Sequence, residues 1–444
     1  MTVNLPAAPG QGWRGWLPTW ERVRALAATK LARDHLLTLA TELTVMAASL
    51  VVLKLAAAYT DTAGFGEFVL ARRMIGLVQL PALCGIGLAL TRSVAMATER
   101  RGPEAQWPYF DGALFITVLT GGFAALLLML GAAPFAALTM GGSSYAPLAR
   151  AIAPGVLGLV LHGVAYGLLR GRQTMVPANL VQALNLGVVP LVVFSFRGLP
   201  IATLVLLTGT VQLGVAILVL LGLRLRGPRP EPLRAMLASA GAELFRYGAP
   251  RVPGEFMLGA LSALPVTAAA HYAGPAEAGR VGLGLSLLSL VGSLFAPLGQ
   301  VMLPAISARV AAGRTAGLGR AVWLLVLACG GMTLVGAALL ELLAPWLLPA
   351  VFGPDFAAAV MPVRIIVLGA VPYVVYIVLR NVLDAIHAAP LNAANLAVAL
   401  GAFGAVMLAL RSAQAVPYGV LAAMSVLGAL TAWRTRRALR DLAT

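Results

Sequence analysis

Residues 201–223 read IATLVLLTGTVQLGVAILVLLGL, and residues 224–230, directly after them, read RLRGPRP. The first stretch contains no charged side chain, and as an α-helix it would extend about 34 Å, enough to cross about 30 Å of hydrocarbon. Arginine-rich segments next to a span are typical of the cytoplasmic side of a membrane. This stretch therefore predicts a membrane-spanning helix whose end lies in the cytoplasm.

The same pattern recurs along the chain, which has 444 residues, is 60% hydrophobic and only 11% charged, and has a mean hydropathy of +0.90. A soluble protein of this length could not hide so much apolar surface. We expect an all-α polytopic membrane protein with about 12 transmembrane helices. The predicted spans are 36–58, 67–90, 111–131, 145–169, 174–196, 201–223, 249–271, 280–303, 320–346, 357–380, 390–410 and 415–433.

The net charge of +16 follows the predicted topology. Five cations lie deep inside predicted spans, and Arg197, Arg280 and Arg411 lie at alternate connectors; the rest of the 32 lysines and arginines lie in the two tails, in every second connector or at the span ends next to those connectors. This bias predicts that both termini are cytoplasmic. The basic excess therefore indicates contact with the lipid bilayer, and no binding of nucleic acid is expected.

The chain divides into two similar halves. We expect a cytoplasmic amphipathic segment at 1–35, spans 1–6 at 36–223, a proline- and arginine-rich cytoplasmic linker at 224–248, spans 7–12 at 249–433 and a basic cytoplasmic tail at 434–444. An offset of 213 residues aligns the halves, which predicts parallel repeats of the kind that hold a substrate between them in transporters. The aligned pairs are Gly66 with Gly279, Leu70 with Leu283, Leu77 with Leu290, Leu90 with Leu303 and Ala95 with Ala308; offsets of 210 and 216 align Leu169-Arg170 with Leu379-Arg380 and Ala178-Asn179 with Ala394-Asn395.

The five intramembrane cations are candidate substrate-binding residues: Arg72, Arg73, Lys54, Arg150 and Arg364. A charge at membrane depth costs about 2.5 to 3.5 kcal/mol on insertion scales, so it usually faces protein, water or a ligand. All five are predicted in the half of the membrane away from the cytoplasm. Arg72 and Arg73 are the deepest, whereas Lys54 and Arg150 lie near span ends, where snorkelling to the interface is the alternative.

Three carboxylates, Glu42, Glu255 and Asp384, are predicted in the cytoplasmic half, where each is a candidate for ion coupling or for gating. Arg251 precedes Glu255 by one helical turn, which predicts a local ion pair. A polar stripe at helical spacing either faces a cavity or packs between helices; it consists of Tyr373, Tyr376, Arg380 and Asp384. Further polar residues for interhelical hydrogen bonds or sugar contact are Asn179, Gln182, Asn185, Asn392 and Asn395.

Signatures of enzymes are missing from the sequence. The histidines at 35, 162, 271 and 387 are scattered, and neither a zinc-protease motif nor a phosphate-cradling loop of the GxxxxGKS type is present. Cys84 and Cys329 lie in apolar spans far apart, so we expect two buried hydrophobic residues there. The sequence therefore favours a transporter over an enzyme.

Five short motifs resemble one known family: GFGEFVLA at 64–71, GIGLALTR at 85–92, FRYGAPRVP at 245–253, PLGQVMLP at 297–304 and VFGPDF at 351–356. Their order is similar to that in the oligosaccharide flippases of the MOP superfamily, the Wzx-type proteins of O-antigen and exopolysaccharide assembly. The resemblance implies two six-helix lobes around a central cavity that alternates between inward- and outward-open states. It also implies transport of an undecaprenyl-pyrophosphate-linked oligosaccharide across a bacterial inner membrane, with polysaccharide polymerase machinery as a partner.

Two other functions stay open at this point. A MATE-like exporter of small organic compounds, coupled to H⁺ or Na⁺, would share the architecture; a cavity lined by cations argues against cationic cargo. A membrane enzyme of the same pathway, such as a polymerase or ligase, usually has a long outer loop with catalytic residues, and we expect none here. No cofactor is expected beyond a coupling H⁺ or Na⁺.

Overall fold

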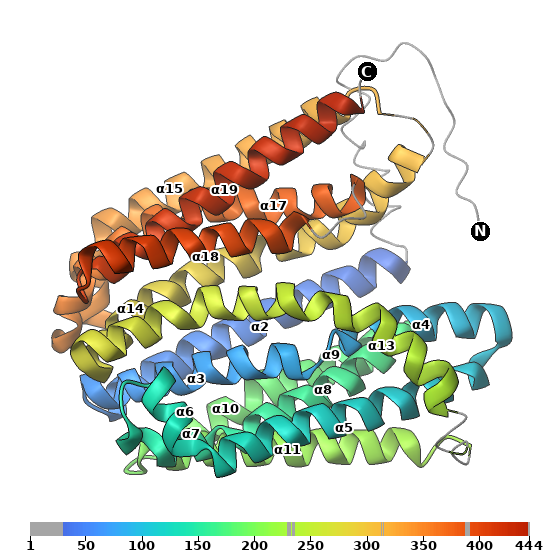
Figure 1. The fold of residues 1–444 in the computed structure, drawn as a ribbon, viewed down its shortest axis with the longest axis horizontal. Coiled ribbons are helices and arrows are strands. Elements are labelled where there is room, and N and C mark those ends of the chain that lie inside the picture. The colour runs from blue at the N-terminus through green and yellow to red at the C-terminus, as the bar shows by residue number, and fades with distance from the viewer. Residues whose placement is uncertain are drawn as a thin grey trace.

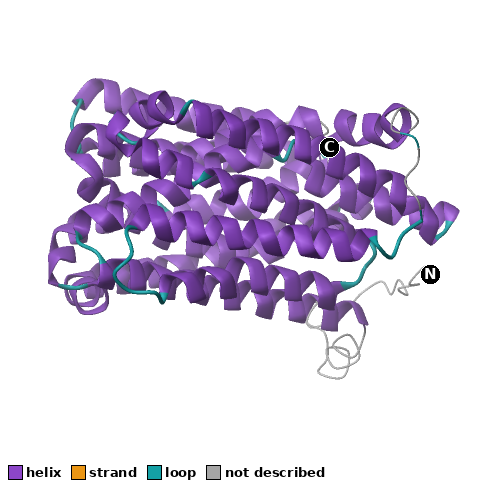
Figure 2. Cartoon of the chain, turned by 90° about the horizontal axis from the view of Figure 1, so that it is seen from below, coloured by secondary structure: helices purple, strands orange, loops and turns teal. Residues whose placement is uncertain are grey.

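The computed structural model describes residues 30–228, 232, 236–311, 313, 315–386 and 391–442. Within these ranges the chain is almost entirely helical and contains no strand, and the loops gather at the two ends of a long bundle (Figure 2). Most of the predicted segment 1–35, part of the linker and residues 443–444 of the tail lie outside the described residues. The helical fold class is thus confirmed.

The first half of the chain forms the lower group of helices in Figure 1. These helices are α2 (Lys30–Tyr59), α3 (Thr62–Ala82), α4 (Ile86–Arg101), α5 (Trp107–Leu130), α6 (Ala132–Thr139), α7 (Ala146–Ala151), α8 (Ala153–Gly171), α9 (Met175–Gln182), α10 (Val189–Phe194) and α11 (Ile201–Arg224), with a π-helix at Ala183–Val188 between α9 and α10.

The second half forms α13 (Ala242–Gly248), α14 (Val252–Ala311), α15 (Leu318–Phe352), α16 (Val360–Leu368), α17 (Ala370–Ile386), α18 (Leu391–Leu410) and α19 (Ala415–Asp441). Helix α14 is two helices joined at Gly274, whose φ of 79° lets the chain reverse there (Figure 1). Nine described helices are long and apolar enough to cross a membrane, or eleven if two bent pairs each count as one span. If the two parts of α14 are counted as separate spans, the number rises from eleven to twelve, which is the number predicted.

The two ends of the bundle differ in charge. Helix α2 begins and α19 ends at the same end of the molecule (Figure 1), and α4 and α11 also finish there with Arg100, Arg101 and Arg224. We call this the basic end. An even number of spans requires both ends of the described chain to lie on one side, as the distribution of charge predicts.

Two predicted spans prove to be broken. The span 67–90 divides into α3 and α4, and the angle between these two helices is 45°. The chain turns here because Cys84 and Gly85 have φ of 51° and 64°. The span 357–380 divides into α16 and α17, bent by 41°. Breaks inside the membrane are tolerated where the freed backbone groups are buried in protein. Gly85 is buried against the backbone of Gly248.

The repeats meet where α3 runs beside the second part of α14. A Cβ on Gly279 would lie 3.1 Å from Cα of Gly66, and a Cβ on Gly282 would overlap the side chain of Val69. Each pair is separated by the repeat offset of 213 residues. Small residues let membrane helices approach this closely, so repeat-equivalent positions face one another across this contact.

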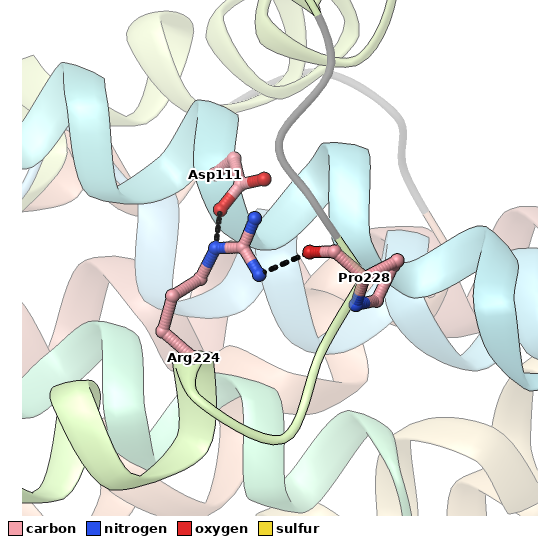
Figure 3. A network of polar contacts seen from close by, with 3 residues as sticks. All are labelled: Asp111, Arg224 and Pro228. Carbon is pink, nitrogen blue, oxygen red and sulfur yellow. Dashed lines mark hydrogen bonds and ion pairs between the residues drawn. The ribbon is translucent and has the colours of Figure 1, made fainter.

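The start of the linker is attached to the first half (Figure 3). Arg224 at the end of α11 forms an ion pair of 2.9 Å with Asp111 of α5 and donates a hydrogen bond of 2.6 Å to the carbonyl of Pro228. Its guanidinium also lies 5.7 Å from the ring centroid of Trp107. These contacts hold the described part of the linker against α5 at the basic end.

Candidate functional site

Arg72 and Arg73 lie in the middle of α3 and face different neighbours. They follow the first residue of α3 by ten and eleven residues, about 15 Å along the helix. Arg73 donates a hydrogen bond of 3.1 Å to Oγ of Ser286 on α14, again a residue 213 positions away. Adjacent residues on a helix point about 100° apart, so Arg72 turns from this contact toward the interior of the first half.

Arg72 lines a pocket of about 340 Å³ between α2, α3, α10 and α11. Most of the lining is apolar, and the polar groups other than Arg72 come from Ser49, Gln79, Thr208 and Gln212. The described residues give Arg72 no ion pair. An unpaired cation at this depth is expensive, so the pocket suits an anionic group with an apolar body.

The predicted stripe on α17, which we call the α17 row, extends from the contact between the repeats to the basic end. Tyr373 lies within electrostatic range of Arg73 and stacks on Tyr376 with ring centroids 6.3 Å apart. The guanidinium of Arg380 lies 5.9 Å from the Tyr376 ring. Asp384 is exposed and accepts a hydrogen bond of 2.7 Å from Asn392. Tyr376 is only 2% exposed, so its ring packs between helices while the row opens toward Asp384.

Glu42 belongs to a hydrogen-bonded chain that the sequence did not predict. Gln182 donates to its carboxylate at 3.3 Å, and Oε1 of Gln182 lies 2.9 Å from Nε2 of the buried His162, which donates in the matching tautomer. His162 stacks on Tyr166, and Arg170 lies 5.4 Å from that ring. Glu42 of α2, Gln182 of α9 and His162 of α8 therefore bring three helices together.

The predicted ion pair between Arg251 and Glu255 is not among the ion pairs of the described residues. Arg251 instead donates to the carbonyl of Tyr247 and lies 3.8 Å from the ring centroid of that residue. Glu255 accepts a hydrogen bond from the backbone of Gly85, at the start of α4, and its Oε2 is buried without a partner in the described residues. A carboxylate is favourable at a helix N-terminus, so Glu255 ties α14 to the broken span.

The other three predicted cations lie on segments near the opposite end from the basic one (Figure 1). Lys54 and Arg150 are both exposed, on α2 and α7. Arg364 forms an ion pair of 2.7 Å with Glu341 of α15, and its side chain is 44% exposed. None of the three lines the pocket of Arg72, and their role in binding stays a prediction.

Two repeat offsets in the sequence point to residues of the site that we did not predict, among them Ser286 and Tyr166. The offset of 213 that aligns Gly66 with Gly279 also aligns Glu42 with Glu255, and Arg73 with its partner Ser286. The offset of 210 aligns Tyr166 with Tyr376, so each half has a Tyr–Arg pair one turn apart. No sequence signal marks the Gln182–His162 contact, since it joins helices through tertiary packing.

Comparisons with known proteins agree with this architecture. An inward-facing multidrug resistance MATE family transporter of the MOP superfamily has a TM-score of 0.75 at 14% sequence identity, with 92% of this chain and 99% of that chain covered. The eukaryotic MATE transporter AtDTX14 has a TM-score of 0.66 at 13% identity, with 93% and 98% covered. An outward-facing MATE family transporter of the MOP superfamily has a TM-score of 0.63 at 13% identity, with 94% and 98% covered.

None of the curated proteins matches the chain in sequence. The family described as "Polysaccharide biosynthesis protein" matches residues 31–309, which is more than half of the chain. The family match confirms the resemblance predicted from the motifs, and the likeness to MATE family transporters shows that the chain shares their fold. The chain belongs to the polysaccharide biosynthesis protein family.

Proposed function

We propose that this transporter is a flippase that moves an undecaprenyl-pyrophosphate-linked oligosaccharide from the cytoplasmic to the outer leaflet by alternating access. Its product would serve the assembly of O-antigen or exopolysaccharide. The observation that carries the proposal is Arg73, an arginine at mid-membrane where the repeats meet, with the α17 row leading to it from the basic end. A diphosphate cannot cross hydrocarbon unless cations and hydrogen-bond donors replace its water.

The arrangement in the membrane is part of the same proposal. The two groups of helices would act as lobes that rock about the α3–α14 contact, joined by the linker 224–248. The basic end and both termini would face the cytoplasm of a bacterium, in keeping with the positive-inside rule. Arg72 and Arg73 would bind the head group at mid-membrane, with Lys54 and Arg150 nearer the exit, while Arg364, already paired with Glu341, would contribute least. Polysaccharide polymerase machinery would receive the product.

Glu42 is the strongest candidate for the coupling group. Its carboxylate is held by Gln182 and lies in electrostatic range of Arg170, so gaining a proton would alter contacts with α8 and α9 together. Coupling by Na⁺ would act on the same carboxylate. Glu255 and Asp384 are better placed for gating, because Glu255 tethers α14 to α4 and Asp384 lies at the exposed end of the α17 row.

A MATE-like exporter of small organic compounds, coupled to H⁺ or Na⁺, is the second candidate, favoured by the likeness in fold to MATE transporters. Complementation separates the two functions. The chain is expressed in a strain that lacks its own oligosaccharide flippase, and surface polysaccharide and the efflux of a cationic dye are both measured. Restored polysaccharide without efflux supports the flippase, whereas efflux without polysaccharide would overturn it.

A further inference from the structure

Two arginines lie over one tyrosine, and a third arginine precedes it in the chain, where α4, α13 and the start of α14 meet at the basic end. The guanidinium carbon of Arg92 lies 4.7 Å from the ring centroid of Tyr247, and that of Arg251 lies 3.8 Å from it. Arg246 precedes the tyrosine and, like Arg92 and Arg251, is exposed. We call Arg92, Arg246, Tyr247 and Arg251 the Tyr247 cluster.

The positive charge of the cluster is only partly balanced. None of the ion pairs in the described ranges includes Arg92, Arg246 or Arg251. Arg251 lies in electrostatic range of Glu255 and Asp384, whereas Arg92 and Arg246 share the lining of one hollow with Glu243. The guanidinium groups of Arg92 and Arg251 share the ring of Tyr247 and repel each other, so a bound anion would stabilise the arrangement.

A hollow of about 480 Å³ opens beside the ring. Arg92, Arg246 and Tyr247 line it together with Ser239 and Glu243, and the remaining lining residues are Ala238 and Ala242. The oxygens of Glu243 are already engaged, because Tyr109 donates to one at 2.7 Å and Ser93 to the other at 3.3 Å. These hydroxyl donors fix the carboxylate in place but leave it charged, so the hollow is lined by two arginines against one carboxylate, and one positive charge is left for an anion.

We propose that the Tyr247 cluster binds a phosphate-bearing head group at the basic surface of the membrane. Planar guanidinium groups hold phosphate oxygens in pairs, and stacking on Tyr247 fixes the orientation of Arg92 and Arg251 beforehand. Two sources share this chemistry: an anionic phospholipid of the bilayer, and the diphosphate of the cargo as it is loaded. The second source rests on the proposed function. Arg251 connects the cluster to Glu255 and Asp384, so a head group bound here lies next to the candidate gate.

The test measures binding to the full chain in a neutral detergent. The probes are dioctanoyl phosphatidylglycerol, for a lipid head group, and farnesyl diphosphate, for a prenyl diphosphate. The double variant R92Q/R246Q is compared with R197Q/R411Q, whose arginines lie at the opposite end and of which Arg197 also stacks on a tyrosine, Tyr59, at 5.1 Å. We expect R92Q/R246Q to bind at least one probe about tenfold more weakly, and the control to bind as wild type does.

Substitution of Tyr247 distinguishes a site whose arginines are held in place by the ring from a basic surface without fixed geometry. Tyr247→Phe keeps the aromatic face and should keep the affinity, whereas Tyr247→Leu should lose about as much as the arginine variant does. Thermal melting of each variant establishes that it is folded. Unchanged affinity for both probes in R92Q/R246Q, or no binding of either probe to the wild type, would overturn the proposal.

The outcome also separates this proposal from the proposed function. If only phosphatidylglycerol depends on the arginines and complementation fails, the cluster is a lipid site and the flippase assignment is wrong. If complementation succeeds while neither probe responds to the arginine variant, the flippase stands and the cluster is not a binding site. A loss confined to farnesyl diphosphate identifies the cargo as the source.

Discussion

The two halves of the molecule contain the same tyrosine–arginine pair in different surroundings. Tyr166 and Arg170 of α8 correspond to Tyr376 and Arg380 of α17, and the ring-to-guanidinium distances are 5.4 and 5.9 Å. In the first half the nearby carboxylate comes from another helix, since Glu42 of α2 is held through α9. In the second half Asp384 lies one turn further along α17 itself.

This difference indicates different roles for the two carboxylates. A group held by three helices changes its surroundings whenever those helices move, so its ionisation is linked to conformation. Asp384 moves together with Arg380 on α17, so a rearrangement changes this pair much less and acts on Asp384 mainly through Asn392 of α18. We therefore assign coupling to Glu42 in the first half and keep Asp384, at the exposed end of the α17 row, as a candidate gate.

The largest effect is expected from exchanging the two carboxylates for amides. Glu42→Gln should reduce transport about 100-fold, equivalent to about 2.7 kcal/mol, because an amide cannot exchange the coupling proton. Asp384→Asn should reduce it less than about tenfold, because Asp384 is exposed and keeps its partner Asn392. Transport is measured in proteoliposomes with an imposed pH gradient. Equal losses in the two variants would remove the distinction between the halves.

The two adjacent arginines test the contact between the halves. Arg73→Gln should lower transport about tenfold or more, because it removes the cation at the α3–α14 contact, and Arg73→Lys should restore part of the rate. Arg72→Gln should act mainly on the apparent affinity, since Arg72 lines a pocket within one half. The rate measured over a series of cargo concentrations separates these effects. If Arg72→Gln lowers the maximal rate and Arg73→Gln does not, the roles assigned to the two arginines are the wrong way round.

Packing at the repeat contact predicts an effect on stability. A Cβ on Gly66 would lie 1.8 Å from the carbonyl oxygen of Pro275, so Gly66→Ala forces the two halves apart. We expect a loss of about 1–3 kcal/mol, the usual range for overpacking. Gly76→Ala is the control on the same helix, because nothing lies within 4 Å of its Cβ position. Melting curves in detergent should show a lower midpoint for Gly66→Ala alone; matching midpoints would refute the close contact.

The smallest effect is expected for the cation furthest from the contact. Arg364 is half-exposed and paired with Glu341, so Arg364→Gln should change stability by no more than about 1 kcal/mol and should leave transport near the wild-type rate. The double variant with Glu341→Gln should behave in the same way. A severe transport defect in Arg364→Gln that Glu341→Gln does not share would instead make this arginine a cargo contact.

The spans were predictable because the membrane imposes one length and one composition on each of them. The reversal at Gly274 falls between the predicted spans 249–271 and 280–303, as expected. A kink in this span could be predicted from Pro81, but the break at Cys84 and Gly85 could not, because it depends on contact with Gly248. Contacts within the site, such as Gln182 with His162, join helices distant in sequence, and periodicity within one helix carries no information about them.

The central claim is that an anionic head group crosses at the contact between the halves, beside Arg73. The most direct measurement is the movement of a fluorescent undecaprenyl-pyrophosphate-linked oligosaccharide in proteoliposomes, followed by its accessibility to a reductant that cannot cross the bilayer. We predict rapid exchange between leaflets with the wild type and with Arg364→Gln, and at least about tenfold slower exchange with Arg73→Gln. Exchange by Arg73→Gln at the wild-type rate, or none by the wild type, would contradict the account.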